Sequence, residues 1–534
     1  MNRRELGLGI ATGAMVVAAG SAEARQAGRR PMPPGQPVPS QPAQAAPGAN
    51  RERYTAQIQR LPAGIQNDVR AFYEMQGYRP VWTGAQFQAL NTAARKAERH
   101  GLASSDYFDF VGLAADPNSG DVRTTAAALT YARVLAQGAV DPETVEELWE
   151  MNKNVVDLPT GLSNALTRNQ LGQWFDALPP TDIGYTNLST GYIRYRRLSS
   201  AGGWPVFRQG AGIEPGQSDA RIPALIARLV AEGDLTEAAG ARLKAQGLVY
   251  GSELQTAVRS FQTRHGLGAD ARIGAGTQRS LGASSDDRAR QIALNLERRR
   301  WLSRSLNPER IEVNTAAAIM VYWKDGRPVH SNRVVVGSAE NQTPSLEKPF
   351  ASVVANPPWT VPMGIARREI LPKGPGYLAA NDMYVNADGW VVQRAGPRAA
   401  LGYVKFELRD SYAIFLHDTP SKAAFNLSTR QRSHGCVRVQ DAVEFARTLL
   451  SPDPARLALF DEAQASRETK RIQTGREIAV RLLYWTAFVD GQQRVAFRED
   501  VYKRDQKLAQ ALGIAVTLPV PVDDGAAVAN DVGP

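Results

Sequence analysis

The sequence predicts a multidomain α+β protein, with helical regions followed by a mainly β domain that an insertion interrupts. Three observations support this fold class. The chain has 534 residues, more than one hydrophobic core usually serves. Apolar residues follow helical spacing in much of the N-terminal half and strand spacing from Ile311 onward. A stretch rich in glycine and arginine, from Gly364 to Ala400, separates two groups of predicted strands.

Residues 1–24 have the pattern of a cleavable export signal. Arg3 and Arg4 precede an apolar run, and Ala22-Glu23-Ala24 fits the small-residue rule for signal peptidase. The paired arginines also fit a twin-arginine signal. No later stretch approaches about 20 uninterrupted apolar residues, so we expect no stable membrane insertion once the signal is removed.

The next two regions are a linker and a helical domain. Residues 25–50 are rich in Pro, Gln, Ala and Gly, which predicts a disordered linker. Residues 51–214 predict a helical domain that we interpret as a scaffold. Its clearest signals are Ile65, Val69, Phe72 and Tyr73 at helical spacing, Gly77 as the end of that helix, and a second helix over Thr124 to Gln137.

Residues 215–284 predict a compact three-helix unit. Leu254, Val258 and Phe261 lie on one face of a helix that His265-Gly266-Leu267 ends. The unit resembles the peptidoglycan-binding domain family through Phe261-Gln262, Gly266-Leu267, Ile273-Gly274 and Thr277. The family's Asp-Gly and Gly-Pro pairs appear here as Asp270-Ala271 and Gly274-Ala275, so a plain helical spacer is an equal alternative. A connecting helix is expected over 285–308.

Residues 309–451 predict the mainly β domain. Ile319 to Trp323 and Val329 to Val336 flank Asp325-Gly326, which is the turn pair typical of a hairpin. The insertion at about 364–400 predicts a lid or cap. Further strands are expected at Phe350–Ala355, Tyr403–Leu408 and Tyr412–His417. Residues 452–534 are expected to form an extension with a strand-like Ile478–Val489 and a disordered acidic end.

The only cysteine of the chain, Cys436, lies in Ser433-His434-Gly435-Cys436-Val437-Arg438. A thiolate is the attacking form of cysteine, so a reactive cysteine needs a base such as His417 nearby. An inert buried cysteine and a zinc site built from Cys436, His434 and His417 are the alternatives. Asp441 and Glu444 predict a capping box that starts a helix, which would place Cys436 in a strand-to-helix loop.

The net charge of +10 does not indicate a nucleic-acid partner. The basic residues are scattered, and no basic arm or recognition motif accompanies them. An anionic polymer outside the cytoplasm, or a membrane surface, fits the charge and the predicted export better.

The string from His417 to Ser433-His434-Gly435-Cys436-Val437-Arg438 resembles the signature of the L,D-transpeptidase catalytic-domain family, of the YkuD type. The likeness extends through Asn356 to Pro362, Arg368 to Pro372 and Pro375 to Leu378. With the helical region and the embedded binding-like unit, the chain resembles the large members of that family, which carry a capping subdomain. The resemblance implies a mainly β L,D-transpeptidase catalytic domain with a capping insertion.

The resemblance also implies the site. Cys436 is the nucleophile and His417 is the base, with the Asp418 carbonyl orienting the ring; the Asp418 side chain is the alternative. The backbone amides of Gly435 and Cys436, with His434, would meet the oxyanion. His434 holding the loop is the alternative to a catalytic role. The expected substrate-binding residues are Ser433, Asp418, Arg438, Trp359 and Tyr377, and a structural role is the alternative for Arg438 and the aromatic residues. No metal or cofactor is implied.

The implied reaction attacks a tetrapeptide stem of peptidoglycan, releases D-alanine and forms a 3-3 cross-link in the periplasm. Stem peptides and glycan are the expected partners, and carbapenems the expected covalent inhibitors of Cys436. Three alternatives stay open: a cell-wall cysteine amidase or endopeptidase, attachment of an outer-membrane protein to the wall, and a non-catalytic wall-binding scaffold.

Overall fold

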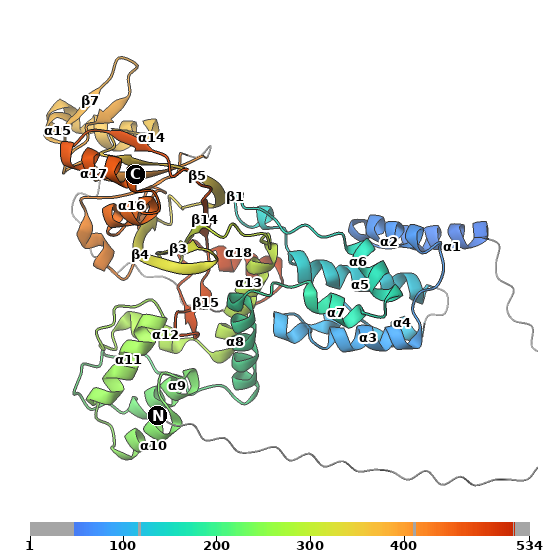
Figure 1. Cartoon of the computed structure of the whole chain (residues 1–534). Helices are drawn as coiled ribbons and strands as arrows, with labels where there is room; N and C mark the ends of the chain where they lie inside the picture. The colour runs from blue at the N-terminus through green and yellow to red at the C-terminus, as the bar shows by residue number, and fades with distance from the viewer. Residues whose placement is uncertain (1–46, 116–118, 410–412, 516, 518–534) are drawn as a thin grey trace, which may run out of the picture. The chain divides into compact units, whose positions relative to one another are not determined.

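A computed structural model describes residues 47–115, 119–409, 413–515 and 517 (Figure 1). The predicted signal at 1–24 and most of the predicted linker at 25–50 lie outside these ranges. Helix α1 (Pro47–Gln59) begins before the predicted end of the linker, because proline suits a first helical position, where its missing N–H is not needed. Within the described ranges, no helix has both the length and the hydropathy that a membrane crossing requires.

Helices α1 to α7 of the N-terminal region share one hydrophobic core. The residues predicted for the face of α2 are all buried, and Gly77 follows the helix with a φ of +61°. The second predicted helix, α5, extends back to Gly120. The elements are α2 (Ala63–Met75), α3 (Gly84–Ala94), η1 (Ala97–His100), η2 (Ser104–Asp106), α4 (Phe110–Ala114), α5 (Gly120–Gln137), η3 (Pro142–Thr144), α6 (Leu158–Thr167), α7 (Leu171–Ala177) and α8 (Ile183–Ser200).

Residues 215–284, all of which are described, contain four helices rather than the three predicted. The additional helix is α10 (Glu237–Ala245), which the Thr236 side chain caps. Helix α10 is hard to predict from the sequence, because only Gly240 and Leu243 of this helix are buried and the helix therefore has no apolar stripe. The others are α9 (Ile222–Glu232), α11 (Ser252–Arg264) and α12 (Ala275–Gly282), and the predicted face of α11 lies in their common core.

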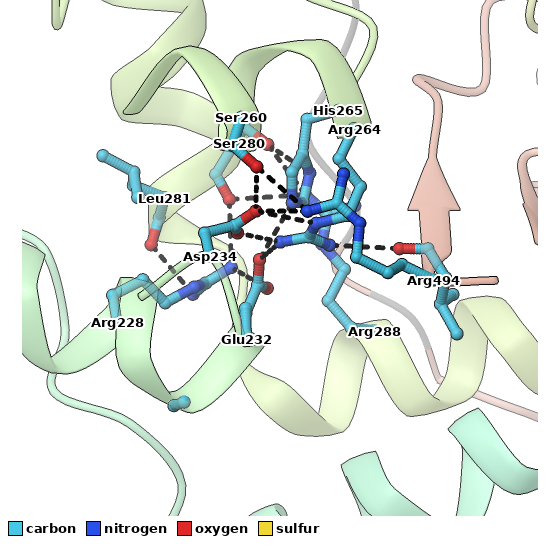
Figure 2. A network of polar contacts seen from close by, with 12 residues as sticks. Arg228, Glu232, Asp234, Ser260, Arg264, His265, Ser280, Leu281, Arg288 and Arg494 are labelled. Carbon is cyan, nitrogen blue, oxygen red and sulfur yellow. Dashed lines mark hydrogen bonds and ion pairs between the residues drawn. The ribbon is translucent and has the colours of Figure 1, made fainter. Parts of the chain in front are cut away.

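A buried ion-pair network lies among these helices (Figure 2). Glu232 pairs with Arg228 at 2.9 Å and with Arg264, which also binds Asp234 at 2.5 Å. Burial opposes ionisation of Glu232, but Arg228 and Arg264 hold the pKa of this carboxyl well below its usual range. Burial also lowers the pKa of His265, so this imidazole is neutral beside Glu232. The network is therefore a permanent structural feature of the fold.

The network also reaches residues outside the binding-like unit. Arg494 donates to Ser260 at 2.9 Å, and Arg288 of helix α13 (Ser285–Trp301) donates to the Ser280 hydroxyl at 3.1 Å. Ser284 and Asp287 form a capping box at the start of α13. Helix α13 ends at Trp301, within the predicted connecting segment 285–308.

Among the described residues, eleven strands join one main sheet. Its order is β1-β5-β14-β2-β3-β4-β12-β10-β9, and β5 also pairs with β9, so the sheet closes on itself. Strand β11 pairs with β4, and strand β13 pairs with β5. The bounds are β1 (Trp149–Glu150), β2 (Arg310–Asn314), β3 (Ile319–Lys324), β4 (Arg327–Gly337), β5 (Ser345–Ala355), β9 (Val404–Leu408), β10 (Leu416–His417), β11 (Gln431–Ser433), β12 (Val437–Val439), β13 (Lys470–Ile472) and β14 (Ala479–Leu483).

The hairpin of β3 and β4 is confirmed, with Asp325 and Gly326 at positive φ as its turn requires. The main sheet continues past the predicted domain boundary at residue 451, because β14 pairs with both β2 and β5. Val480 and Leu482 of β14 complete the core between these two strands. The predicted strand over Ile478–Val489 divides into β14 and β15 (Ala487–Val489), and β15 pairs with β16 (Val495–Phe497).

Helices α16 (Ala442–Leu450) and α17 (Pro454–Ser466) pack against the core of the main sheet. Helix α16 starts after Asp441 as predicted, but the predicted capping box is wrong. Asp441 has a φ of +49° and its side chain makes no cap hydrogen bond, because a capping side chain needs an extended backbone at this position. Helix α18 (Arg504–Ala511) follows β16, and the predicted disordered end lies outside the described residues from 518 onward.

The predicted insertion folds as a cap with its own small core. This core begins at Trp359 and extends to Leu401, so the folded cap is slightly longer than the predicted 364–400. A separate sheet of order β6-β8-β7 supports it. The elements are β6 (Trp359–Thr360), α14 (Met363–Ile365), the π-helical turn η4 (Ala366–Ile370), η5 (Leu371–Lys373), α15 (Gly374–Ala380), β7 (Met383–Val385) and β8 (Val391–Gln393).

Candidate active site

The strands β10 and β12 bring His417 and Cys436 to the same side of the main sheet. The two strands are parallel, with Leu416 paired to Val437 and His417 paired to Arg438. Leu416 and Val437 lie in the core, and successive side chains of a strand alternate between faces. His417 and Arg438 therefore face away from the core, and so does Cys436, which directly precedes Val437.

Cys436 lies in a turn between two strands, β11 and β12, and not in the predicted strand-to-helix loop. The difference arises because Val437 to Val439 pair with both β4 and β10, which postpones helix α16 to residue 442. Gly435 has a φ of +119°, which side chains rarely allow. Its N–H donates to the Ser433 hydroxyl at 3.2 Å, so meeting an oxyanion would require this N–H to exchange partners.

Ser433 and Thr343 hold the Cys436 turn in place. The buried Ser433 hydroxyl donates to the Cys436 carbonyl at 2.6 Å while it accepts from Gly435. The Thr343 hydroxyl donates to the Gly435 carbonyl at 2.8 Å. Ser433, predicted to bind substrate, therefore lies beneath the turn. Thr343 had no local signal in the sequence, because it reaches the turn from the loop after β4.

The His417 ring is fully buried, and the Asp418 carbonyl fixes its orientation. Nδ1 lies 2.5 Å from that carbonyl oxygen, which can only accept, so Nδ1 carries the proton. Nε2 then presents its lone pair, and no described group hydrogen-bonds to it. Burial, and then the positive charge of Arg438, lower the pKa of His417 to about 3. The imidazole is neutral at physiological pH, which is the form that accepts a proton.

The Asp418 carboxylate has partners other than the His417 ring. It accepts from the Tyr403 N–H at 3.0 Å and pairs with Lys422. The alternative in which this side chain orients His417 is therefore wrong. Gly402 permits the arrangement, because a side chain there would collide with the Asp418 carboxylate.

Cys436 lies at the wall of a cavity of about 700 Å³, within the usual size of ligand sites. The thiol is 6% exposed, and Sγ contacts the Ala413 carbonyl at 3.8 Å. The cap lines one wall through Thr360, Pro362, Gly364, Ile365 and Arg368. The main sheet and its loops line the rest, through Asn341, Ala351, Lys405, Glu407, Leu408, Ala413, Ile414, Phe415 and His434.

The remaining predicted substrate-binding residues do not line this cavity. Trp359 is buried in the core of the cap, and Tyr377 packs against that core with Lys373 over its ring. Arg438 is buried on β12, where its charge acts on His417. The charged residues that do line the cavity are Arg368, Lys405 and Glu407. Arg368 lies in a stretch that carries the family resemblance, whereas no sequence pattern singled out Lys405 or Glu407.

His434 connects the Cys436 turn to the cap. Its Nε2 lies 3.0 Å from the Glu369 carboxylate, on the π-helical turn of the cap. Such turns occur frequently at functional sites. Glu369 lies in the stretch from Arg368 to Pro372 that carries the family resemblance, but its contact with His434 was not predicted, because the contact depends on how the cap folds back over the turn. In the described part of the chain, no three His, Cys, Asp or Glu side chains converge as metal ligands.

Comparison with known families agrees with this geometry. Residues 308–459 match the YkuD family model, described as the L,D-transpeptidase catalytic domain. This chain carries an L,D-transpeptidase catalytic domain. A second family model, described as the scaffold domain, matches residues 67–191. The predicted fold class, a helical scaffold region with a mainly β L,D-transpeptidase catalytic domain, is confirmed. The resemblance of residues 215–284 to a peptidoglycan-binding domain stays a prediction.

A Haemophilus influenzae protein assigned as an L,D-transpeptidase is 29% identical to this chain over 240 residues. The match covers 41% of this chain and 48% of that protein, so the chain spans about half the length of its relative. An L,D-transpeptidase structure from Xylanimonas cellulosilytica is 17% identical, covering 52% of this chain and 98% of that one, with a TM-score of 0.18. A mutant L,D-transpeptidase from Enterococcus faecium is 14% identical, covering 33% and 50%, with a TM-score of 0.17.

Proposed function

We propose that this protein is an L,D-transpeptidase that forms 3-3 cross-links between peptidoglycan stems. One observation carries the proposal: a neutral, oriented His417 and a cavity-lining Cys436 face the same side of the sheet under a cap. A nucleophile, an oriented base and a bound acyl group are what acyl transfer needs. The residues at the site thus supply the chemistry that the catalytic-domain family implies.

In the first half of the reaction, the proton of the Cys436 thiol passes to Nε2 of His417. The thiolate attacks the carbonyl of the third stem residue, and the oxyanion forms beside the backbone of the Cys436 turn. Collapse breaks the amide bond to the terminal D-alanine. The His417 imidazolium protonates the departing amine, so D-alanine leaves and a thioester remains on Cys436.

In the second half, an amine of a neighbouring stem attacks the thioester. His417 takes a proton from this amine, the C–S bond breaks, and the thiol regains its proton. We expect the cap to favour this outcome over hydrolysis, because cap residues line one wall of the cavity and a wall that displaces water favours transfer to the amine. Arg368 and Lys405 supply positive charge at the cavity wall, which suits the carboxylates of a stem peptide.

The test is to incubate the purified protein with disaccharide-tetrapeptides and to analyse the products by mass spectrometry. We expect cross-linked dimers and free D-alanine, both lost in Cys436→Ala and in His417→Gln. His330→Gln is the matched control, because His330 stacks on Phe445 in the sheet core and does not line the cavity. A carbapenem is expected to add once, at Cys436.

The alternatives give different products. Shortened monomers without dimers would indicate a cysteine peptidase or amidase, and no product with any acceptor would indicate a wall-binding scaffold. Dimers that form only with a protein amine would indicate attachment of an outer-membrane protein. We place the reaction in the periplasm; processing after Ala24 on expression in a Gram-negative host, found by N-terminal sequencing, would test this.

A further inference from the structure

The cap sheet exposes large apolar side chains on its outer face. Its inner face packs on the cap core through Trp359, Met383 and Val391. Strand alternation turns Thr360, Tyr384 and Val392 to the opposite face. Tyr384 is 39% exposed, and so is Trp390, which precedes β8 on the same face as Val392. The hairpin that carries these residues is labelled β7 in Figure 1.

These outer residues form a continuous strip, which we call the cap strip: Thr360, Tyr384, Trp390, Val392 and Arg394. Thr360 pairs with Val392, and Val392 pairs with Tyr384, so the three lie in one row across the sheet. Trp390 and Arg394 follow two residues to either side of Val392, which makes them diagonal neighbours of Tyr384.

The cap strip is continuous with the catalytic cavity. Thr360, at one end of the row, lines that cavity. Neighbouring strands lie about 4.8 Å apart, so Tyr384 lies about 10 Å from Thr360, two strands away. A ligand that leaves the cavity past Thr360 would therefore meet the strip next.

The composition of the strip suits a sugar polymer that also carries negative charge. Aromatic side chains are rigid and offer an apolar face, and exposed apolar patches of this kind commonly mark binding sites. The Arg394 guanidinium stacks on the Tyr384 ring at 4.4 Å from its centroid, which places a cation beside the aromatic surface. A sugar ring can pack against such a surface while a carboxylate or amide oxygen binds the arginine.

We propose that the cap strip binds the glycan strand from which the donor stem hangs. This inference rests on the proposed function, which puts the third residue of the stem at Cys436. Three extended residues span at most about 10 Å, so the glycan attached to that stem has to lie near the rim of the cavity. The cap strip begins at that rim, at Thr360.

The test compares ligands with and without sugar on Cys436→Ala protein, which binds without turnover. Calorimetry measures Kd for a disaccharide-tetrapeptide and for the free tetrapeptide. We expect the sugar to improve Kd about tenfold, as one well-packed aromatic anchor does, and Trp390→Ala or Tyr384→Ala to reduce this preference to less than threefold. Val111→Ala, which alters a highly exposed apolar residue on α4, should keep the full preference.

An N-acetylglucosamine tetrasaccharide, monitored by tryptophan fluorescence, separates this inference from the proposed function. If the wild type makes no cross-links but binds the tetrasaccharide through Trp390, glycan binding by the cap strip is supported and the proposed function is refuted. If cross-links form but the preference for sugar is absent or survives both substitutions, the strip is refuted. Self-association of the protein without glycan, abolished by Trp390→Ala, would also refute it, because the face would then be an interface between copies.

Discussion

The buried neutral state of His417 predicts a specific pH dependence of stability. The pKa of the ring falls from 6.5 to about 3 on folding, chiefly through burial. Between these two values the unfolded chain binds a proton that the folded chain does not, so stability falls as the pH falls. One pKa unit corresponds to about 1.4 kcal/mol, so roughly 5 kcal/mol separates the two limits, and about 3 kcal/mol of it is lost between pH 7 and pH 4.

Urea unfolding at pH 7, 5.5 and 4 measures this contribution. The wild type should lose about 3 kcal/mol more than His417→Gln between pH 7 and pH 4, because the glutamine cannot take up a proton. Carboxylates and the other histidines whose pKa folding lowers, His100 and His265, contribute equally to both proteins and cancel in the difference.

Parallel stability curves for the wild type and His417→Gln would refute this reasoning. A direct check is the NMR titration of the ring protons of His417, which should show no transition between pH 8 and pH 4. A midpoint near 6.5 would mean that the ring is solvated in the folded protein. Arg438→Gln should raise the pKa of His417, because it removes the positive charge that lowers this pKa most.

Two further substitutions test the loop contact and the buried network. Glu369→Gln removes the charge beside His434 and should slow acylation of Cys436 roughly fivefold, as expected for a partly exposed charge-assisted hydrogen bond. Stopped-flow measurements give the acylation rate, with Glu444→Gln as the control. Equal rates for the two variants would argue against a positioning role for Glu369. Glu232→Ala removes the carboxylate that pairs with the buried Arg228 and one of the two that pair with Arg264, and should cost about 3–5 kcal/mol in urea unfolding. The exposed Glu237→Ala should stay within about 0.5 kcal/mol of the wild type, and a similarly small effect for Glu232→Ala would mean that the network is solvated.

Local signals explain the elements that the sequence predicted well. The hairpin around Asp325-Gly326 and the helix α2 depend on turn chemistry and on periodicity within a few residues. The insertion of β14 between β2 and β5 has no such signal, because pairing of distant strands is decided by the closure of the whole sheet. For this reason a domain boundary drawn at residue 451 divides a continuous sheet.

The residues of the candidate site also fall into two groups, those that a local sequence motif predicts and those that depend on the tertiary fold. His417 lies on β10 and Cys436 in the turn just before the neighbouring β12, and one sequence motif contains both residues, so sequence alone brings them together. The cavity wall is different, because which side chains of the cap reach it depends on the tertiary fold of residues 359–401. Trp359 was a reasonable candidate for the cavity but serves the core of the cap, while Arg368, to which the sequence motif assigned no role, lines the cavity.

The cap thus contributes to the site separately from the catalytic pair. It lines the cavity through Arg368, contacts the Cys436 turn through Glu369, and exposes the cap strip around Trp390. Its fold depends on its own core, whereas His417 and Cys436 are held by the main sheet. Substitutions on the outer face of the cap should therefore alter substrate preference while the orientation of the His417 ring stays fixed.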